Sequence, residues 1–281
     1  MTEPVDTWAL QRLAILTRYL CAFTTAWKDR PFSTAYIDAF SGADYCGNDL
    51  GDSSRLGGFP ALADAPPKAL LKCSARVVLA TDPAFDGYVF IEQNGQRCRA
   101  LETLQRQFPD RNIQIKRSDA NRELRRISHL YRQPRRAVLF VDAYATNLEW
   151  DTIIDVSRTN AIDMWLLFPV GIGSYQPAGK AIGLPPHWRD RLKRLLESDE
   201  WFTGFDRSPP PLDGLVETLR QSFRERLKGV FANVAVPRVM RSRSGAPLYL
   251  LCFASGAPGL DGRMAVELAD HLLESMAADP D

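Results

Sequence analysis

Residues 34–42 have the sequence TAYIDAFSG, an apolar run that closes on Ser41 and Gly42. Aromatic and β-branched residues dominate the run, and a serine and glycine after it are typical of a turn. We therefore predict the first core strand over Thr34–Phe40. Upstream, apolar residues recur every three or four positions between Trp8 and Trp27, which predicts an amphipathic helix. The first structural unit is thus a helix followed by a buried strand.

Four more compact apolar runs follow, and segments with helical periodicity separate them. The predicted strands are Gly87–Glu92, Ile113–Lys116, Ala137–Asp142 and Ile162–Phe168, and the predicted helices are about Gly95–Phe108, Asn121–Tyr131 and Leu148–Arg158. Near-continuous apolar strands divided by helices predict a parallel sheet that is covered on both faces, because right-handed crossovers lay helices on each side. The expected fold class is α/β, with a doubly wound, mostly parallel, Rossmann-like sheet.

The length of 281 residues suits one large α/β domain. We expect a helical lead-in at 1–33, a core at 34–170, a helical insertion at 171–232, and completion of the sheet with a last helix at 233–281. The elements expected after residue 170 are helices at Pro185–Leu196 and Asp213–Leu227, an apolar segment at Val234–Met240, a strand at Leu248–Ala254 and a helix at Gly262–Met276. A hairpin is one way in which the last strands can complete the sheet.

The composition is that of an ordinary globular protein, with 45% hydrophobic and 25% charged residues. It excludes disordered, collagen-like and coiled-coil chains. The 35 Lys and Arg residues nearly balance the 34 Asp and Glu residues, so a nucleic-acid site would have to be a local patch. No apolar run approaches the roughly 20 residues that span a bilayer, and Met1–Asp6 lacks the features of a signal peptide. We expect a soluble cytoplasmic protein with no membrane partner.

The cysteines and histidines give no sign of a metal site or of a disulfide framework. The five cysteines are odd in number and never form a CxxC pair, and the three histidines are far apart in sequence. Cys46 lies in a segment expected near the ligand site, and an incidental loop thiol is its simplest interpretation. We expect no metal in this chain.

Acidic residues follow or end several of the predicted strands. Asp38 lies in the first strand, Glu92 ends the second, Asp119 falls shortly after the third, and Asp142 ends the fourth. Ligands dock at the carboxyl ends of strands in open parallel sheets, and crowded carboxylates favour a ligand that brings donors or positive charge. A nucleoside-like, partly cationic cofactor fits this pattern. For each acid alone, a solvated strand end or a helix cap is the alternative.

The surroundings of the first strand narrow the choice of cofactor. The segment Gly42–Pro67 is rich in Gly, Asp, Ser and Pro, and a long irregular excursion at this place is often functional. The turn at Phe40–Ala43 lacks a complete GxGxxG pattern, and no GxxxxGK[ST] motif occurs. These absences disfavour triphosphates and make an NAD-linked oxidoreductase a weak alternative.

The order of these features, with longer stretches of sequence, resembles the three-Cys-motif partner proteins. That family is similar to the class I methyltransferases that depend on S-adenosylmethionine (SAM). The resemblance covers nearly the whole chain and is carried by Arg12–Leu20 (RLAILTRYL), Tyr36–Gly42 (YIDAFSG), Tyr88–Glu92 (YVFIE), Leu139–Tyr144 (LFVDAY), Glu149–Thr152 (EWDT), Ala161–Gly171 (AIDMWLLFPVG) and Pro247–Gly256 (PLYLLCFASG). The tryptophan-to-proline run at 165–169 and the late CFASG are its more specific parts.

The resemblance implies SAM as the cofactor and assigns it a set of residues. Asp38 and Gly42 would line its methionine side, with Phe40 in the same turn, and Glu92 would hold its ribose. Asp119 and Ala120 would lie at its adenine. One departure bears on this site: the family commonly has Gly-x-Gly after the first strand, whereas Asp44 here replaces the second glycine. That change adds a Cβ and a charge where backbone approaches ligand.

The resemblance places the transfer position at Asp142–Tyr144. Tyr144 could stack on a planar acceptor such as a base, and Asp142 could accept a hydrogen bond from its amino group. Packing of Tyr144 in the core is the equal alternative. The family's Asp-Pro-aromatic motif is Asp142-Ala143-Tyr144 here, which loses the proline that would stiffen the turn.

Three arginine-rich stretches could contact phosphate, at 122–136, 189–194 and 238–243. A solvated helix face is the usual role of such charge. We expect Arg238, Arg241 and Arg243 to be the better substrate-binding candidates, because the loop predicted to bear them lacks neighbouring acids.

The sequence thus favours a SAM-dependent, methyltransferase-like protein that acts on a large substrate, with nucleic acid as the candidate. The family resemblance also implies a partner, an iron–sulfur protein with three cysteines. A non-catalytic scaffold is the alternative function. It would keep the fold and offer Gly42–Pro67 and Arg238–Arg243 as a docking surface.

Overall fold

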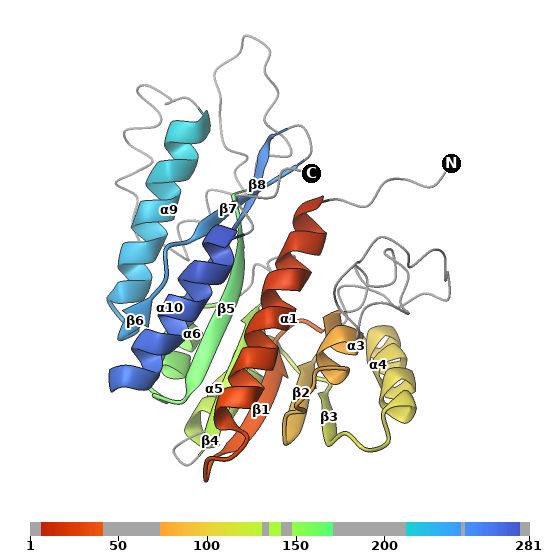
Figure 1. Ribbon diagram of the computed structural model, residues 1–281. Coiled ribbons are helices and arrows are strands. Elements are labelled where there is room, and N and C mark those ends of the chain that lie inside the picture. Colours follow the sequence, from red (N-terminus) through yellow and green to blue (C-terminus); the bar gives the residue numbers. More distant parts are fainter. Residues whose placement is uncertain are drawn as a thin grey trace.

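The computed structural model describes residues 7–41, 74–130, 135–141, 148–170, 212–242 and 245–275, which form one sheet with helices on both faces (Figure 1). The helices are α1 (Thr7–Trp27), α3 (Ser74–Leu79), α4 (Gly95–Gln107), α5 (Ala120–Leu130), α6 (Trp150–Ser157), α9 (Leu212–Lys228) and α10 (Gly259–Ser275). The strands are β1 (Ser33–Asp38), β2 (Gly87–Ile91), β3 (Ile113–Lys116), β4 (Arg135–Val141), β5 (Ile162–Pro169), β6 (Asn233–Val234), β7 (Arg238–Arg241) and β8 (Pro247–Ser255). The expected α/β fold class is confirmed.

The strand order is β3-β2-β1-β4-β5-β8-β6. The first five strands in this order are parallel to one another. Strand β8 runs antiparallel to β5, and β6 runs antiparallel to β8, so β6 points the same way as the parallel five. Helices α4, α5 and α6 connect consecutive parallel strands. The chain is therefore doubly wound around a mostly parallel sheet, as the alternation of apolar and helical segments predicts.

The segment Val234–Met240 is an edge strand in two pieces. Strand β6 pairs with the end of β8 and β7 pairs with its beginning. Pro237 lies between the two pieces and has no N–H to donate to the ladder, which accounts for the break. Strands β7 and β8 are antiparallel neighbours joined by a short connection, so the expected hairpin is confirmed.

Other expectations for the second half of the chain have mixed outcomes. Helix α9 confirms the helix expected at Asp213–Leu227, and α10 confirms the last helix. The helix expected at Pro185–Leu196 lies outside the described residues, as does the excursion Gly42–Pro67. None of the described helices is both long and apolar enough to cross a bilayer.

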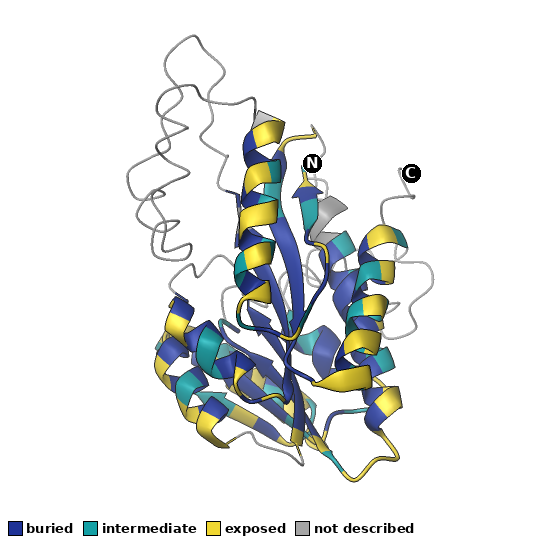
Figure 2. Cartoon of the chain, turned by 90° about the vertical axis from the view of Figure 1, so that its left-hand side faces the viewer, coloured by how far each residue is buried: buried dark blue, intermediate teal, exposed yellow. Residues whose placement is uncertain are grey.

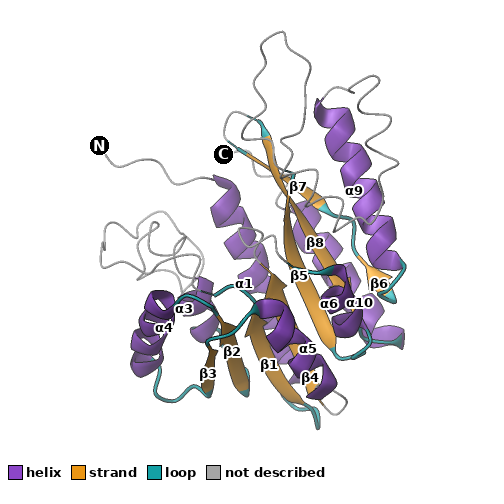
Figure 3. Ribbon diagram, turned by 180° about the vertical axis from the view of Figure 1, so that it is seen from behind, coloured by secondary structure: helices purple, strands orange, loops and turns teal. Residues whose placement is uncertain are grey.

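Two helical layers cover the sheet, and the side chains of alternate strand residues pack against opposite layers. Side chains such as Tyr36, Phe140 and Trp165 pack against α1, α3, α4 and α10. Their neighbours Ile37 and Leu139 face the opposite layer, made of α5, α6 and α9. Helices α1 and α10 lie side by side in Figure 1, and α5 and α6 lie over the strands in the reverse view of Figure 3. The strands between the layers are almost wholly buried (Figure 2).

Local hydrogen bonds explain where α4 and α6 begin. The side chain of Asn94 accepts from the backbone N–H groups of Gln96 and Arg97, at 2.9 and 3.2 Å, and so caps α4 directly after β2. The Oδ1 atom of Asn121 in α5 accepts from the backbone N–H of Glu149 and from the Thr152 hydroxyl, both at 2.9 Å. The two hydrogen bonds to Asn121 fix the start of α6 against α5. Their donors, Glu149 and Thr152, belong to the EWDT stretch.

Candidate functional site

The carboxyl end of β1 carries a buried acid in a closed turn. Asp38 is 1% exposed, and its Oδ1 accepts from the backbone N–H of Phe40 at 3.1 Å. Its carbonyl oxygen accepts from the Ser41 hydroxyl at 3.0 Å, while the Ala39 N–H donates to the Phe140 carbonyl of β4. These bonds hold the Asp38 carboxylate at the edge of the sheet. Phe40 is half-buried and packs against the core beside it.

Ser41 ties the end of β1 to the end of β2. Its backbone N–H donates to the Ile91 carbonyl at 3.0 Å, and its hydroxyl oxygen accepts from the Ile91 N–H at 3.2 Å. The sequence predicted only a turn at Ser41. The structure shows that it joins the ends of β1 and β2, and its place directly after a buried strand was the signal for this.

Glu92 follows β2 and is 8% exposed. One carboxylate oxygen accepts from the Asn94 backbone N–H at 2.7 Å, and the other lies 3.6 Å from an Arg97 guanidinium nitrogen. A carboxylate has about four lone-pair sites, and the backbone N–H of Asn94 uses one of them. Arg97 is roughly half-exposed and belongs to the first turn of α4. The Arg97 end of this ion pair is therefore open to solvent.

Asp119 precedes α5 and has both oxygens engaged. Oδ1 accepts from the Arg122 backbone N–H at 3.0 Å, which makes Asp119 a helix cap, and Oδ2 accepts from the Gln93 side-chain amide at 2.8 Å. The Gln93 contact joins the ends of β2 and β3. Ala120 is buried and is the first residue of α5. Asp119 is thus a helix cap, as the alternative interpretation predicted, and it also lies at the edge of the sheet.

The structure brings Asp38, Glu92 and Asp119 to the same edge. They end or follow β1, β2 and β3, which are parallel neighbours in the sheet. Strands β1 and β3 are two strand spacings apart, which is about 10 Å. We refer to Asp38, Ser41, Glu92 and Asp119 as the carboxyl rim. Gly42, Asp142, Tyr144 and Arg243 lie outside the described residues, so their placement is not part of this rim.

One thiol lies against the rim. Cys98 of α4 is buried, and its Sγ donates to the Glu92 carbonyl at 3.3 Å. Burial raises the pKa of this thiol, and the nearby Glu92 carboxylate raises it further. Both effects favour the protonated thiol over the nucleophilic thiolate at Cys98. Within the described ranges, no group of three or more His, Cys, Asp or Glu side chains could hold a metal ion.

The arginines expected in a loop free of acids are placed differently. Arg238 and Arg241 belong to strand β7, so the expectation of a loop there is wrong. Arg238 is partly buried and donates to the Leu273 carbonyl at the end of α10. Arg241 pairs with Asp213 of α9 at 2.9 Å. The sequence missed this acid because α9 reaches β7 only through the tertiary fold.

Arginines of α5 are paired in the same way. Arg125 contacts Glu149 at 2.6 Å, and Arg126 contacts Glu123 at 2.7 Å. Each ion pair lowers the charge available to a phosphate. These contacts agree with the solvated, balanced helix face that was the simpler interpretation of this stretch.

The strand order decides the kind of fold. Five parallel strands run in the order β3-β2-β1-β4-β5, and the antiparallel β8 is inserted between β5 and β6. This is the class I methyltransferase fold. The acidic rim lies at the carboxyl ends of its first three strands, where such sheets bind ligands.

Comparison with known proteins gives likeness in structure alone. No protein-family model and no curated protein sequence matches the chain. The protein LPL1258 from Legionella pneumophila has a TM-score of 0.50 at 12% identity, over 98% of this chain and 93% of that one. The N-terminal domain of EvdMO1, solved with SAH bound, has a TM-score of 0.38 at 10% identity, over 86% and 81%. The bifunctional kinase-methyltransferase WbdD has a TM-score of 0.43 at 11% identity, over 88% of this chain and 39% of its own. At these identities the likeness is one of fold.

Proposed function

We propose that this protein binds SAM at the carboxyl rim and is a methyltransferase-like enzyme. The observation that supports this most is the meeting of Asp38, Glu92 and Asp119 on three neighbouring parallel strands. The two strand spacings between β1 and β3, about 10 Å, are comparable with an extended nucleoside, and the three acids suit a ligand with hydroxyls, an amino group and a sulfonium charge. SAM combines these groups in one molecule.

Each rim residue has a role in this proposal. Glu92 accepts two hydrogen bonds from the ribose hydroxyls, each worth roughly 1.5–3 kcal/mol because the acceptor is charged. Asp38, with Phe40 and Gly42 of the same turn, holds the methionine end. Asp119 and Ala120 lie at the adenine.

For the chemical step we propose Asp142 and Tyr144. When bound, SAM supplies a methyl group on a sulfonium, so alignment of the acceptor matters more than acid or base strength. Tyr144 supports a planar acceptor by stacking, and Asp142 orients the acceptor's amino group by accepting a hydrogen bond. Both residues follow β4, the neighbour of β1 on the side away from β2.

The acceptor we propose is a large substrate, with nucleic acid as the first class to test. Arg238, Arg241 and Arg243 stay the candidates for contacting it, although Arg241 must then exchange Asp213 for a phosphate. A three-cysteine iron–sulfur partner is a further proposal that rests on the family resemblance. Purification of the native complex, with iron analysis of any protein that accompanies it, tests that partner.

A non-catalytic scaffold is the second candidate. Arg97 already lies 3.6 Å from the Glu92 carboxylate and would compete with a ribose for it. Asp44 and Ala143, where the family commonly has glycine and proline, favour the same alternative. In this function the fold persists as a docking platform without methyl transfer.

Thermal denaturation with SAM and with S-adenosylhomocysteine distinguishes the two functions. At a hundredfold excess over Kd, binding adds about 2.7 kcal/mol, which raises Tm by about 5 °C or more. Glu92→Gln should weaken binding at least tenfold, whereas Glu102→Gln removes an exposed charge of α4 away from the rim and should bind normally. No shift in the wild-type protein with either ligand would reject SAM binding and favour the scaffold.

Catalysis needs its own test. Radiolabelled SAM is incubated with total RNA, DNA and cell protein, and methyl incorporation is followed for the wild type and Asp142→Asn. The variant should bind SAM as the wild type does but transfer at least tenfold more slowly. Equal transfer by the two proteins would show that Asp142 does not take part.

A further inference from the structure

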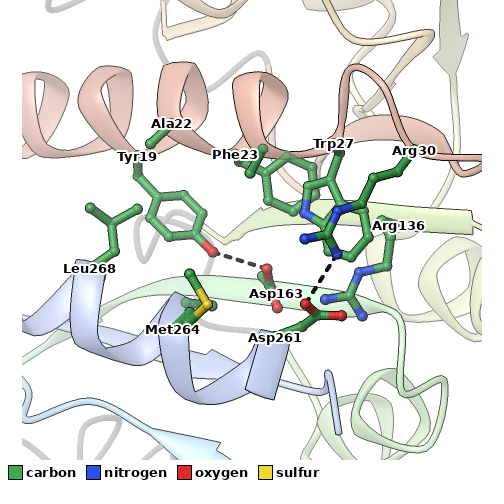
Figure 4. Close-up of a pocket in the computed structure, with 12 residues that line it drawn as sticks. Tyr19, Ala22, Phe23, Trp27, Arg30, Arg136, Asp163, Asp261, Met264 and Leu268 are labelled. Atoms are coloured by element: carbon green, nitrogen blue, oxygen red, sulfur yellow. Dashed lines mark hydrogen bonds and ion pairs between the residues drawn. The ribbon is translucent and has the colours of Figure 1, made fainter. Parts of the chain in front are cut away.

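A pocket lies at the opposite end of the sheet from the carboxyl rim, between helices α1 and α10 (Figure 4). Its volume is about 330 Å³, within the range of small-molecule sites. Arg136 and Asp163, at the amino ends of β4 and β5, form its floor. The residues that line it are Tyr19, Ala22, Phe23, Ala26, Trp27, Arg30, Arg136, Asp163, Asp261, Met264, Ala265 and Leu268.

The acid on the floor is fixed by groups from distant parts of the chain. Asp163 is 1% exposed; its Oδ2 accepts from the Tyr19 hydroxyl at 2.9 Å, and its Oδ1 accepts from the Ser255 hydroxyl at 2.5 Å. Two of its roughly four acceptor sites are thus occupied. The two hydrogen bonds orient the carboxyl group, and it still has acceptor capacity toward the pocket.

The cation on the floor has donors to spare. Arg136 is 2% exposed, and one terminal nitrogen donates to the Asn160 carbonyl at 3.2 Å. Its Nε makes no hydrogen bond with any described residue, and its Cζ lies 4.6 Å from the Trp27 ring centroid. Among the described residues no ion pair joins Arg136 to Asp163, although both line the same cavity. A buried guanidinium with unused donors is costly unless an acceptor reaches it.

The walls are apolar and largely aromatic. Rings of Tyr19, Phe23 and Trp27 line the α1 side, and Met264 and Leu268 line the α10 side. Flat rings and a polarisable thioether favour a flat aromatic guest. At the mouth, Arg30 and Asp261 form an exposed ion pair with a separation of 3.2 Å.

We propose that this pocket binds a small, uncharged aromatic molecule of the aryl carboxamide type. Its carbonyl oxygen accepts from Arg136, its amide nitrogen donates to Asp163, and its ring lies between the α1 aromatics and Met264. The lining holds two acids, Asp163 and Asp261, and two arginines, so a charged guest of either sign meets repulsion as well as attraction. A neutral group with an acceptor next to a donor can bond to both Arg136 and Asp163 on the floor. The proposal concerns the amino end of the sheet and is independent of SAM binding.

Three probes of nearly the same shape test the preference for an uncharged guest. They are benzamide, benzoate and benzamidine. Saturation-transfer NMR and titration of tryptophan fluorescence should detect benzamide with a Kd on the order of 1 mM, as expected for a molecule of this size. Benzoate and benzamidine should bind at least tenfold more weakly, because each brings a repulsive charge to the floor. Absence of benzamide binding at about 10 mM, or tighter binding by either charged probe, would overturn the proposal.

Variants locate the binding. Ala22→Trp and, from the facing helix, Ala265→Trp fill the cavity without altering its charges, and each should reduce benzamide affinity at least tenfold. Leu260→Ala, a change at an exposed residue of α10 that does not line the pocket, should leave the affinity unchanged. Arg136→Lys keeps the charge but loses the fork of donors, and it should weaken benzamide about tenfold. Equal benzamide binding by folded Ala22→Trp and Ala265→Trp would place the site elsewhere.

Discussion

The two ends of the sheet hold their polar groups in different ways. At the carboxyl rim, Asp38 and Glu92 each accept from a backbone N–H only two residues ahead. At the amino end, Asp163 accepts from Tyr19 and Ser255, which are 144 and 92 positions away in the chain. The polar groups of the rim are held by hydrogen bonds within single turns. Those of the amino-end floor are held by side chains that only tertiary packing brings together.

The difference predicts unequal costs of mutation. The capping bonds of Asn94 and Asp119 beside the rim are exposed, so solvent partly replaces a bond that is lost there. The floor is shielded by α1 and α10, and a group that loses its partner there keeps its desolvation cost. Changes at the amino end should therefore affect stability, and changes at the rim should affect ligand binding.

The largest effect is expected for Asp163→Ala. The change leaves the Tyr19 and Ser255 hydroxyls without their acceptor and the Arg136 charge without its nearby acid. We expect a loss of about 3–5 kcal/mol in the free energy of unfolding, measured by urea denaturation. Tyr19→Phe, which removes one hydrogen bond, should cost about 1 kcal/mol and serves as the control. A loss below about 1 kcal/mol in Asp163→Ala would break the contrast between the two ends.

The pH dependence of stability sharpens the same contrast. Burial raises the pKa of Asp163 from its ordinary value of 3.8, opposed by Arg136 and by the hydrogen bonds from Ser255 and Tyr19, and assisted by the charge of Asp261. At pH values between the unfolded and the folded pKa, the folded chain therefore binds more protons at Asp163 than the unfolded chain does. The contribution of Asp163 is complete below about pH 4 and declines as the pH rises through the folded pKa, by about 1.4 kcal/mol per pH unit.

The measurement for this prediction compares the wild type with Asp163→Asn. Urea denaturation from about pH 4 to about pH 8 gives the difference in free energy of unfolding between the two proteins, in which other titrating groups cancel. We expect the wild type to lose stability relative to the variant as the pH rises. A relative gain with rising pH would show that the folded environment lowers the pKa of Asp163.

A smaller effect is expected at the rim for Asn94→Ala. The side chain of Asn94 caps α4, and its removal should cost about 1 kcal/mol in the free energy of unfolding. Asn94→Asp keeps a capping oxygen next to the positive end of the helix dipole and should be nearly neutral. If Asn94→Ala cost as much as Asp163→Ala, the rim would not be a locally built structure.

The smallest effect is expected for Arg30→Gln at the mouth of the pocket between α1 and α10. Arg30 is 48% exposed and Asp261 is 42% exposed, so solvent screens their ion pair. The change should alter the free energy of unfolding by less than about 1 kcal/mol, and by less still at high salt. A larger loss would mean that the Arg30–Asp261 ion pair is shielded from solvent, as the groups on the floor are.

Much of the fold and part of the site could be predicted from the sequence. Apolar periodicity located the strands of the parallel sheet, and the strand ends located Asp38, Glu92 and Asp119. The sequence could not show that Asp119 bonds to Gln93, because that contact joins two turns. It also misjudged Arg241, whose acid partner Asp213 belongs to a helix 28 positions away.

The sequence by itself determined the α/β alternation, the order of acids along the chain and the expectation that they share one edge. These depend on local periodicity and on the fixed direction of parallel strands, both of which are written within short segments. The tertiary structure alone decided that Tyr19, Arg136, Asp163 and Ser255 share one buried floor. Their meeting depends on how α1 and α10 pack on the sheet, and long-range packing leaves no periodic signal in a single sequence.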